Sequence, residues 1–493
     1  MEFQKANDGM MIDLYELTMS NGFFASGKAN QSAVFDVFYR HNPDQGGFSI
    51  FAGLGQVLEW VQSLHFSGRD IDYLKSLNIF RSDFLEYLRE FKFKGDIYAF
   101  DEGTIMYPNE PILSVHASLP ECMFLETAVL AMINHQSLIA TKARRMVRAA
   151  NGRPIADFGA RRAHNIDAAV YGARASYIGG LVATSTLEAA ETFGIPCSGT
   201  MAHSWVMSFD DEYEAFKTYA EEYPDNALLL IDTYDVMRSG LPNAIKLAHE
   251  YLEPKGKRLK GVRIDSGDLA YLSKKIRKEL DKEGLEDAII VVTNSLDENT
   301  ISSLLNQGAA VNSFGIGERL ITAMSDPILG GVYKMAAIEI DGEMKPRIKV
   351  SETAEKITNP GVKQVWRIYN HDRKAVADLI SLADEKVELN HPFHYIDPVN
   401  PWRDRAFTSE FTAKPLQHLY IKNGVQVRQQ PELSKIRQYV IDQLRDEIWD
   451  EEQRFENPHI HFLDMTPAYF SMKQALLETM RQKVAAISDR NEH

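Results

Sequence analysis

Residues 199–205 read Gly199-Thr200-Met201-Ala202-His203-Ser204-Trp205, and this stretch follows a short apolar run and precedes a helix-like segment. The pattern predicts that His203 lies where a β-strand passes into a loop. In β/α architectures such loops, at the carboxyl ends of the strands, carry the active site. A single histidine is more often a core residue than a reactive one, so its interpretation depends on the neighbouring segments.

Two other segments have the same form. Residues 157–164 read Asp-Phe-Gly-Ala-Arg-Arg-Ala-His after an apolar run, and residues 261–268 read Gly-Val-Arg-Ile-Asp-Ser-Gly-Asp. Three predicted strand ends therefore carry cations, hydroxyls, carboxylates and a potential nucleophile. This combination is what a site for a phosphorylated polyol requires.

The motifs FGARRAH (158–164), GTMAHSW (199–205) and GVRIDSGD (261–268), with MIDLYELTM (11–19) near the N-terminus, resemble the nicotinate phosphoribosyltransferase family. The resemblance extends from Ile12 to Val365. It implies an α/β fold, namely an irregular (β/α) barrel of the type II phosphoribosyltransferase kind. An N-terminal α/β layer and a C-terminal α+β extension would flank the barrel.

The composition is that of an ordinary globular protein, with 44% apolar and 25% charged residues among 493. A net charge of -15 argues against a nucleic-acid partner, which needs clustered Lys and Arg. Cys122 and Cys197 lie far apart without metal-ligand spacing, which favours a reducing, cytoplasmic location. We expect no signal peptide, no apolar stretch long enough to cross a bilayer and no membrane partner.

Strand-like and helix-like segments alternate between residues 155 and 314. Such alternation implies parallel pairing through helical crossovers. About seven strands come close to the eight of a closed barrel, and an open doubly wound sheet is the alternative. Polar residues at nearly every predicted strand end favour the barrel. The strands are expected near Ile155, Leu181 and Cys197 and at 228–232, 262–265, 289–293 and 310–314.

Three domains are predicted. Residues 1–140 form an N-terminal α/β domain, joined by antiparallel strands within 341–388, and residues 141–340 form the barrel-like catalytic domain. Residues 389–493 form a mainly helical C-terminal domain, with helices expected at 431–454 and 467–486.

The resemblance also implies an activity. The family transfers a phosphoribosyl group from phosphoribosyl pyrophosphate to the ring nitrogen of nicotinate, in NAD biosynthesis and salvage. Pyrophosphate is released, and ATP hydrolysis is coupled to the transfer in a ligase-type reaction. His203 matches the histidine that ATP phosphorylates, and an imidazole nitrogen is a competent phosphoryl acceptor near neutral pH. The expected cofactor is Mg²⁺, with ATP as co-substrate.

Further roles are carried over on the matching positions. Asp265 and Asp268 would be catalytic carboxylates beside the ribose hydroxyls and would hold Mg²⁺, which prefers hard oxygen ligands; Asp268 also suits the cap of a following helix. The other expected contacts are Tyr15, Phe158, Thr200 and Arg263 for nicotinate, and Arg161, Arg162, Ser266, Gly267, Asn294, Gly315 and Gly317 for phosphoribosyl pyrophosphate.

Two positions qualify this assignment. Arg145 is a weaker candidate for the pyrophosphate. Where many relatives have a small hydroxyl residue after the second glycine of residues 314–317, this chain has Glu318.

Tyr15 comes from the other end of the chain, so another domain or a symmetry mate must complete the site. The expectation is a homodimer with a shared active site.

Three alternatives stay open. A nicotinamide-specific phosphoribosyltransferase would share the fold and the phosphohistidine, and would differ at Arg263, which suits an acid rather than an amide. A phosphosugar aldolase or isomerase would need a strand-end lysine or a glutamate base, and the barrel segment has no strand-end lysine. A non-catalytic binding protein would not need the nucleophile.

Overall fold

The computed structural model describes residues 8–351, 356–386, 392–403, 405–408 and 410–491. The chain divides into two compact units, one made of Met1–Leu138 with Ile328–His493 and the other of Ile139–Pro327. Residues 389–493, for which a separate domain was predicted, fall within the first unit. Each unit is described by itself.

The second unit is built on a parallel sheet. Its described strands run in the order β7-β6-β11-β10-β9-β8, and a single bridge between Thr184 and Cys197 extends the β7 edge. All of the strand pairs in this sheet are parallel, as the alternation of strands and helices predicts. The strands are β6 (Ile155–Asp157), β7 (Ala183–Thr184), β8 (Leu228–Leu230), β9 (Gly261–Ile264), β10 (Ile289–Val292) and β11 (Ser313–Ile316).

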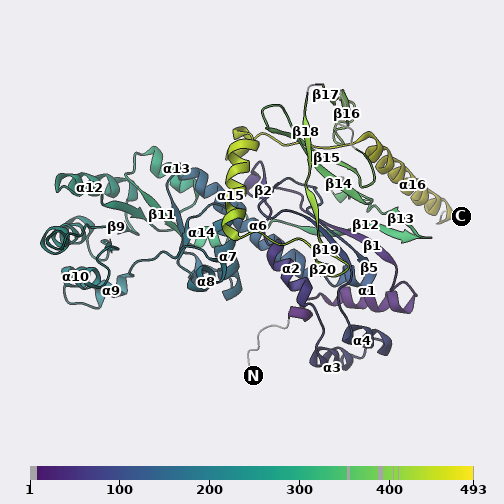
Figure 1. Ribbon diagram of the computed structural model, residues 1–493, viewed down its shortest axis with the longest axis horizontal. Helices are drawn as coiled ribbons and strands as arrows, with labels where there is room; N and C mark the ends of the chain where they lie inside the picture. Colours follow the sequence, from purple (N-terminus) through teal and green to yellow (C-terminus); the bar gives the residue numbers. More distant parts are fainter. Residues whose placement is uncertain (1–7, 352–355, 387–391, 404, 409, 492–493) are drawn as a thin grey trace. The chain divides into compact units, whose positions relative to one another are not determined.

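Helices cover this sheet, and Figure 1 shows β9 and β11 between α12 and α13 on one side and α9 and α10 on the other. Apolar side chains from consecutive strands, such as Val262, Ile290 and Phe314, are fully buried, as expected of a parallel sheet covered on both faces. The helices are α7 (Ile166–Ile178), α8 (Leu187–Phe193), α9 (His203–Met207), α10 (Glu212–Glu222), α11 (Leu241–Leu247), α12 (Leu269–Lys282), α13 (Glu298–Asn306) and α14 (Glu318–Ile321).

Two of these helices begin at a capping carboxylate four or five residues after the end of a strand. Asp268 accepts a hydrogen bond from the Tyr271 amide at 2.9 Å, and Asp297 accepts one from the Thr300 amide at 2.7 Å. Each cap satisfies an amide that the first turn of a helix leaves free. Together with the apolar strands, these caps fix where each strand ends and the next helix begins. The predicted α/β fold with a parallel sheet is confirmed.

The first unit contains an antiparallel sheet in the order β13-β12-β1-β5-β3-β19-β20. Strands from both ends of the chain meet in it, because β1 pairs with β5 on one side and with β12 on the other. The strands are β1 (Ser32–Phe38), β3 (Asp96–Phe100), β5 (Leu113–Ser118), β12 (Val332–Ile340), β13 (Glu343–Pro346), β19 (Gln417–Lys422) and β20 (Val425–Gln426).

A second sheet of this unit has the order β18-β14-β15-β21. Its strands are β14 (Lys363–Tyr369), β15 (Ala375–Leu382), β18 (Thr412–Pro415) and β21 (Leu463–Met465), and the short pairs β2 (Ser49–Ile50) with β4 (Ile105–Met106) and β16 (Phe393–Tyr395) with β17 (Arg405–Phe407) accompany it. The segment predicted as mainly helical therefore also supplies strands.

The helices of the first unit include α16 near the C-terminus, which contacts β15 and is drawn in yellow in Figure 1. Its predecessor α15 continues as a wider π-helical turn at Gln443–Glu447. The helices are α1 (Leu14–Ala25), α2 (Leu54–Ser63), α3 (Gly68–Ser76), α4 (Ser82–Arg89), α5 (Leu119–Met123), α15 (Leu433–Asp442) and α16 (Pro467–Asn491).

Helix α6 (Glu126–Ala149) passes from the first unit into the second. With α5 it forms the run Leu119–Ala149, which is long and apolar enough to cross a membrane by length and composition alone. No such stretch was expected from the sequence, and this run meets only the criterion of length and composition. Because 61% of the apolar window is buried inside the protein, the run has the character of a core helix.

Candidate active site

The carboxyl ends of the parallel strands bring the predicted motifs to one edge of the second unit. Phe158 follows β6, Arg263 lies on β9, and Asn294 follows β10. Gly315 lies within β11, and Gly317 directly follows it. Parallel strands in one sheet all end at the same edge, so segments more than 100 residues apart in sequence meet there.

His203 is the first residue of α9, and its imidazole is partly exposed rather than buried in a core. Its Nδ1 lies 3.1 Å from the Oγ1 of Thr233, which follows β8. A hydrogen bond at one ring nitrogen fixes the orientation of the imidazole and leaves the other nitrogen available. This geometry suits a reactive histidine better than a structural one.

Arg263 and Thr200 lie together, as predicted. The Arg263 Nη1 donates to Thr200 Oγ1 at 2.6 Å, and Nη2 donates to the Met201 carbonyl at 3.0 Å. The Nε of Arg263 is buried and has no hydrogen-bond partner among the residues that the structure describes. Burial lowers the pKa of Arg263, while the carboxylates of Asp265 and Asp232 oppose this shift. A guanidinium held in this way at a strand end has donors left for an additional carboxylate.

Asp232 was not predicted as a site residue, although it follows the apolar run of β8 as the other site residues follow theirs. Its Oδ2 accepts hydrogen bonds from the Asp265 amide at 2.8 Å and from Ser266 Oγ at 2.6 Å. Its Oδ1 is buried and has no partner within the described residues. Asp232 therefore ties the end of β8 to the loop after β9.

The loop after β9 holds the two predicted carboxylates, Asp265 and Asp268. Thr293 Oγ1 donates to Asp265 Oδ1 at 2.6 Å. Asp268 is exposed and caps α12, so its predicted capping role is confirmed. Gly267 between them has a φ of +82°, a left-handed conformation that a residue with a side chain adopts only with strain.

The ends of β6 and β11 fit against each other through a glycine. A Cβ added to Gly315 would lie 2.6 Å from the ring of Phe158, so only glycine leaves room for that ring. Phe158 is partly exposed and its amide donates to the Ile316 carbonyl at 2.7 Å. This packing presents an aromatic face at the edge of the sheet.

Backbone strain marks the loop after β10. Asn294 is exposed and has a φ of +128°, which is rare for a residue with a side chain and is typical of functional loops. Its Oδ1 accepts a hydrogen bond from the Ser295 amide at 2.6 Å.

Glu318 stands directly against these loops as the first residue of α14. It accepts a hydrogen bond from Ser295 Oγ, and its Oε2 lies 3.9 Å from the Nε of Arg162. Arg161 and Arg162 are both exposed. The carboxylate of Glu318 therefore partly neutralises one of the two predicted pyrophosphate ligands.

Two other predicted positions behave differently. Arg145 lies 2.8 Å from the buried carboxylate of Glu298, which also pairs with the buried Lys142, so Arg145 has a structural partner. Tyr15 belongs to the first unit, on α1, and 44% of its surface is exposed. Among the described residues no group of three or more His, Cys, Asp or Glu side chains is arranged to hold a metal ion.

Models of one family cover most of the chain. The nicotinate phosphoribosyltransferase (NAPRTase) family model matches residues 154–379, and the models of the N-terminal and C-terminal domains of the same enzymes match residues 10–134 and 362–473. A nicotinate phosphoribosyltransferase of Bacillus subtilis (strain 168) is 41% identical over 489 residues, which span 98% of both chains. The chain belongs to the nicotinate phosphoribosyltransferase family.

More distant relatives agree with this membership. A nicotinate phosphoribosyltransferase of Caenorhabditis elegans is 34% identical over 517 residues, covering 91% of this chain and 90% of the relative. The crystal structure of human nicotinic acid phosphoribosyltransferase superposes with a TM-score of 0.84 at 28% identity, over 94% of this chain and 99% of that one. The resemblance drawn from the four sequence motifs is thus confirmed for the whole chain.

Glu318 yields the first prediction. A pyrophosphate bound by Arg161 and Arg162 would lie close to this carboxylate, which is 3.9 Å from Arg162, and two like charges about 4 Å apart in a water-like medium repel by about 1 kcal/mol. Glu318→Gln is therefore expected to bind inorganic pyrophosphate about fivefold more tightly, measured by isothermal titration calorimetry. Glu283→Gln, at the far end of α12, serves as the control. Equal affinities for all three proteins would show that Glu318 does not face the anion.

Proposed function

We propose that the protein is an ATP-coupled nicotinate phosphoribosyltransferase, which forms nicotinate mononucleotide and pyrophosphate from nicotinate and phosphoribosyl pyrophosphate in NAD biosynthesis. The single observation that carries this proposal is the guanidinium of Arg263 held by Thr200 in the strand-end loops that also hold His203. Family membership and the names of the relatives support the same activity.

The two parts of nicotinate, its carboxylate and its pyridine ring, would bind to different residues. The carboxylate would pair with Arg263, whose Nε has no partner among the described residues, and would accept from Thr200. The pyridine ring would stack on Phe158, and Tyr15 of a second copy of this chain would cover its other face. The ring nitrogen then attacks C1 of the ribose while the bond from C1 to the pyrophosphate oxygen breaks, and pyrophosphate leaves with the electron pair.

The ribose and its phosphates would meet the remaining strand ends. Asp265 and Asp268 suit the ribose hydroxyls, and Ser266, Gly267, Asn294, Gly315 and Gly317 present hydroxyl, amide or backbone groups to phosphate. Arg161 and Arg162 supply permanent charge for pyrophosphate. Positive charge develops at C1 in such a transfer, and the carboxylates already in place stabilise it.

Mg²⁺ fits these oxygen donors. The ion typically uses one or two carboxylates together with substrate phosphates, and Asp265 and Asp268 follow the same strand while Asp232 has an unpartnered buried oxygen. These residues would hold the ion, which when bound would neutralise charge on the leaving pyrophosphate. The side chains themselves orient the ribose and keep the two loops together.

His203 would link ATP to the transfer. When its Nδ1 carries the proton and donates to Thr233, Nε2 keeps its lone pair. Nε2 then attacks the γ-phosphorus of ATP, the bond from that phosphorus to the β,γ-bridging oxygen breaks, and ADP leaves. The protein is a phosphoprotein in this state, and later hydrolysis of the phosphohistidine supplies the driving force.

Tyr15 lies in the first unit, whereas the other residues proposed for nicotinate lie in the second. We propose a homodimer in which Tyr15 of one copy completes the site of the other. Helix α1 is anchored by Glu16, a buried residue whose carboxylate accepts a hydrogen bond from Thr127 at 2.5 Å. Leu14, Tyr15 and Met19 of α1 are exposed, and Tyr15 and Met19 lie about one helical turn apart. An apolar face of this kind on a surface helix is typical of an interface. We also propose a cytoplasmic location, which the free thiols of Cys122 and Cys197 support.

Arg263 tests acid recognition. Arg263→Ala is expected to raise the KM for nicotinate by tenfold or more, because a charge-assisted hydrogen bond contributes about 1.5 to 3 kcal/mol. The preference for nicotinate over nicotinamide should fall with it. Arg258→Ala, which removes an exposed arginine before β9, is the control. If both the KM for nicotinate and this preference are unchanged, Arg263 has another role.

His203 tests the coupling. Incubation with ATP labelled at the γ-phosphate is expected to leave an acid-labile, base-stable label on the wild type and on His249→Ala. His203→Ala should lose both the label and the stimulation by ATP. A slow transfer without ATP should remain, because positioning of ring and ribose does not use the imidazole. Label on the His203→Ala protein would remove His203 from the mechanism.

Subunit exchange tests the shared site. Tyr15→Ala and His203→Ala proteins are each expected to be weakly active, and mixing them under conditions of subunit exchange should restore part of the activity. Each mixed dimer would then contain one site with both native residues. Tyr73→Ala, at another exposed tyrosine of the first unit, is the control and should be active alone. Absence of recovery after demonstrated exchange would favour a site within one chain.

A further inference from the structure

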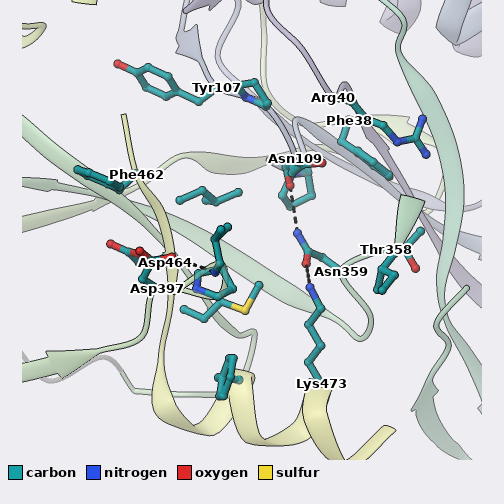
Figure 2. Close-up of a pocket in the computed structure, with 18 of the residues that line it drawn as sticks. Phe38, Arg40, Tyr107, Asn109, Thr358, Asn359, Asp397, Phe462, Asp464 and Lys473 are labelled. Carbon is teal, nitrogen blue, oxygen red and sulfur yellow. Dashed lines mark hydrogen bonds between the residues drawn. The ribbon is translucent and has the colours of Figure 1, made fainter. Parts of the chain in front are cut away.

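A second cavity lies in the first unit, with a volume of about 830 Å³. Its walls come from β1, the turn after Tyr107, the segment around Asn359, β21 and α16 (Figure 2). Sites for small organic molecules typically have volumes of 300 to about 1,000 Å³. None of the residues assigned above to nicotinate, ribose or phosphate lines it.

One wall of the cavity is charge-balanced and rigid. Tyr107 stacks on His461 with ring centroids 3.8 Å apart, and the Tyr107 hydroxyl donates to Glu452 at 2.6 Å. The ring nitrogens of His461 lie 3.4 Å from Asp378 and from Glu452. Burial alone would lower the pKa of His461. The carboxylates of Asp378 and Glu452 raise it by more, so the pKa of His461 lies above its ordinary value. This wall needs no ligand.

On the acidic side of the cavity Arg405 pairs with two carboxylates, and Asp464 Oδ2 is buried without a hydrogen bond from the described residues. Arg405 lies 3.2 Å from Asp397 and 3.5 Å from Asp464. Asp397 additionally accepts hydrogen bonds from two backbone amides. Burial raises the pKa of Asp464 to about 7, so about half of this carboxyl is protonated at neutral pH. The cavity therefore makes no strong demand for a cation.

Lys473 on α16 is the exception. Its Nζ donates to Asn359 Oδ1 at 2.7 Å, and Asn359 Nδ2 in turn donates to the Asn109 carbonyl at 3.2 Å (Figure 2). Throughout the described residues no carboxylate lies within 4.0 Å of this ammonium. The neighbouring Lys363, by contrast, pairs with Asp36. Burial, with a smaller contribution from Lys363, lowers the pKa of Lys473 to about 8.

A partly buried ammonium whose partner is a neutral amide is stabilised by any anion that reaches it. The surroundings are largely apolar, and Phe38, Met465, Phe470 and Leu477 line the same cavity. We propose that this cavity binds an amphipathic organic monoanion, a carboxylate with an apolar body, whose anionic group pairs with Lys473. The site lies outside the proposed catalytic residues and does not depend on the proposed function.

The test uses 8-anilinonaphthalene-1-sulfonate, an aromatic monoanion whose fluorescence rises in apolar sites, with the full-length native protein. We expect saturable binding of one dye per chain. Dodecanoate should displace the dye, and dodecan-1-ol, which lacks the charge, should do so at least tenfold less effectively. His203→Ala should bind the dye as the wild type does.

The matched variants are on α16. Lys473→Met is expected to weaken dye binding at least tenfold, while Lys473→Arg and Lys483→Met, which changes an exposed lysine of the same helix, retain it. Leu477→Trp keeps the ammonium but fills the space, and should abolish binding. Thermal melting and circular dichroism show which variants are folded.

Several results would overturn the proposal. Binding that does not saturate in the wild type, or that is equal in folded Lys473→Met and wild type, would exclude the ammonium as the anchor. If Lys473→Met does not fold, unchanged binding by Leu477→Trp decides against the cavity. Displacement by ATP or inorganic phosphate but not by dodecanoate would identify a phosphate site instead.

Discussion

The parallel pairing of β6, β11, β10, β9 and β8 is the constraint on which the candidate active site depends. Since all of these strands end at one edge, residues as far apart as Phe158 and Gly317 share a surface without any local sequence contact. Asp232 reinforces this edge, because one carboxylate oxygen holds both the amide of Asp265 and the hydroxyl of Ser266. Removing that carboxylate would release the loop that carries the predicted ribose ligands.

The same edge shows how burial and charge are balanced at Arg263. The side chain is largely removed from water, which opposes its charge, yet Asp265 and Asp232 lie near enough to favour it. Arg161 adds a further positive charge that lowers the pKa of Arg263. In the proposed function the carboxylate of nicotinate would form an ion pair with Arg263, which a neutral amide cannot form, so charge would distinguish acid from amide.

Much of the fold could be predicted from the sequence. Apolar runs that end in Gly, Asp, Ser or Asn indicated the parallel strands, and β14 and β15 lie within 341–388, where antiparallel strands were expected. Helix α3 was missed because Gly68–Ser76 is polar and short, with few apolar residues to show a periodicity. The strands β16, β17 and β18 were not predicted, because their segment is rich in Pro and aromatic residues and its polar and apolar residues do not alternate clearly.

The candidate site was predictable where a strand end showed it. The contact between Arg263 and Thr200 joins two motifs that were both recognised, and Asp232 could have been found by the same rule. The pairing of Arg145 with Glu298 could not be predicted, because the two residues lie 153 positions apart and no local sequence pattern links them. The cavity around Lys473 is equally invisible in the sequence, since its walls come from both ends of the chain.

The most direct test of the central claim is the stoichiometry of the coupled reaction. Labelled nicotinate and phosphoribosyl pyrophosphate should yield nicotinate mononucleotide, with ATP consumption measured in the same vessel. Our account predicts that ATP raises the rate and the final extent of product formation, and that ADP accumulates in proportion to product. Product formation that is the same with and without ATP, or ATP hydrolysis that does not respond to nicotinate, would contradict it.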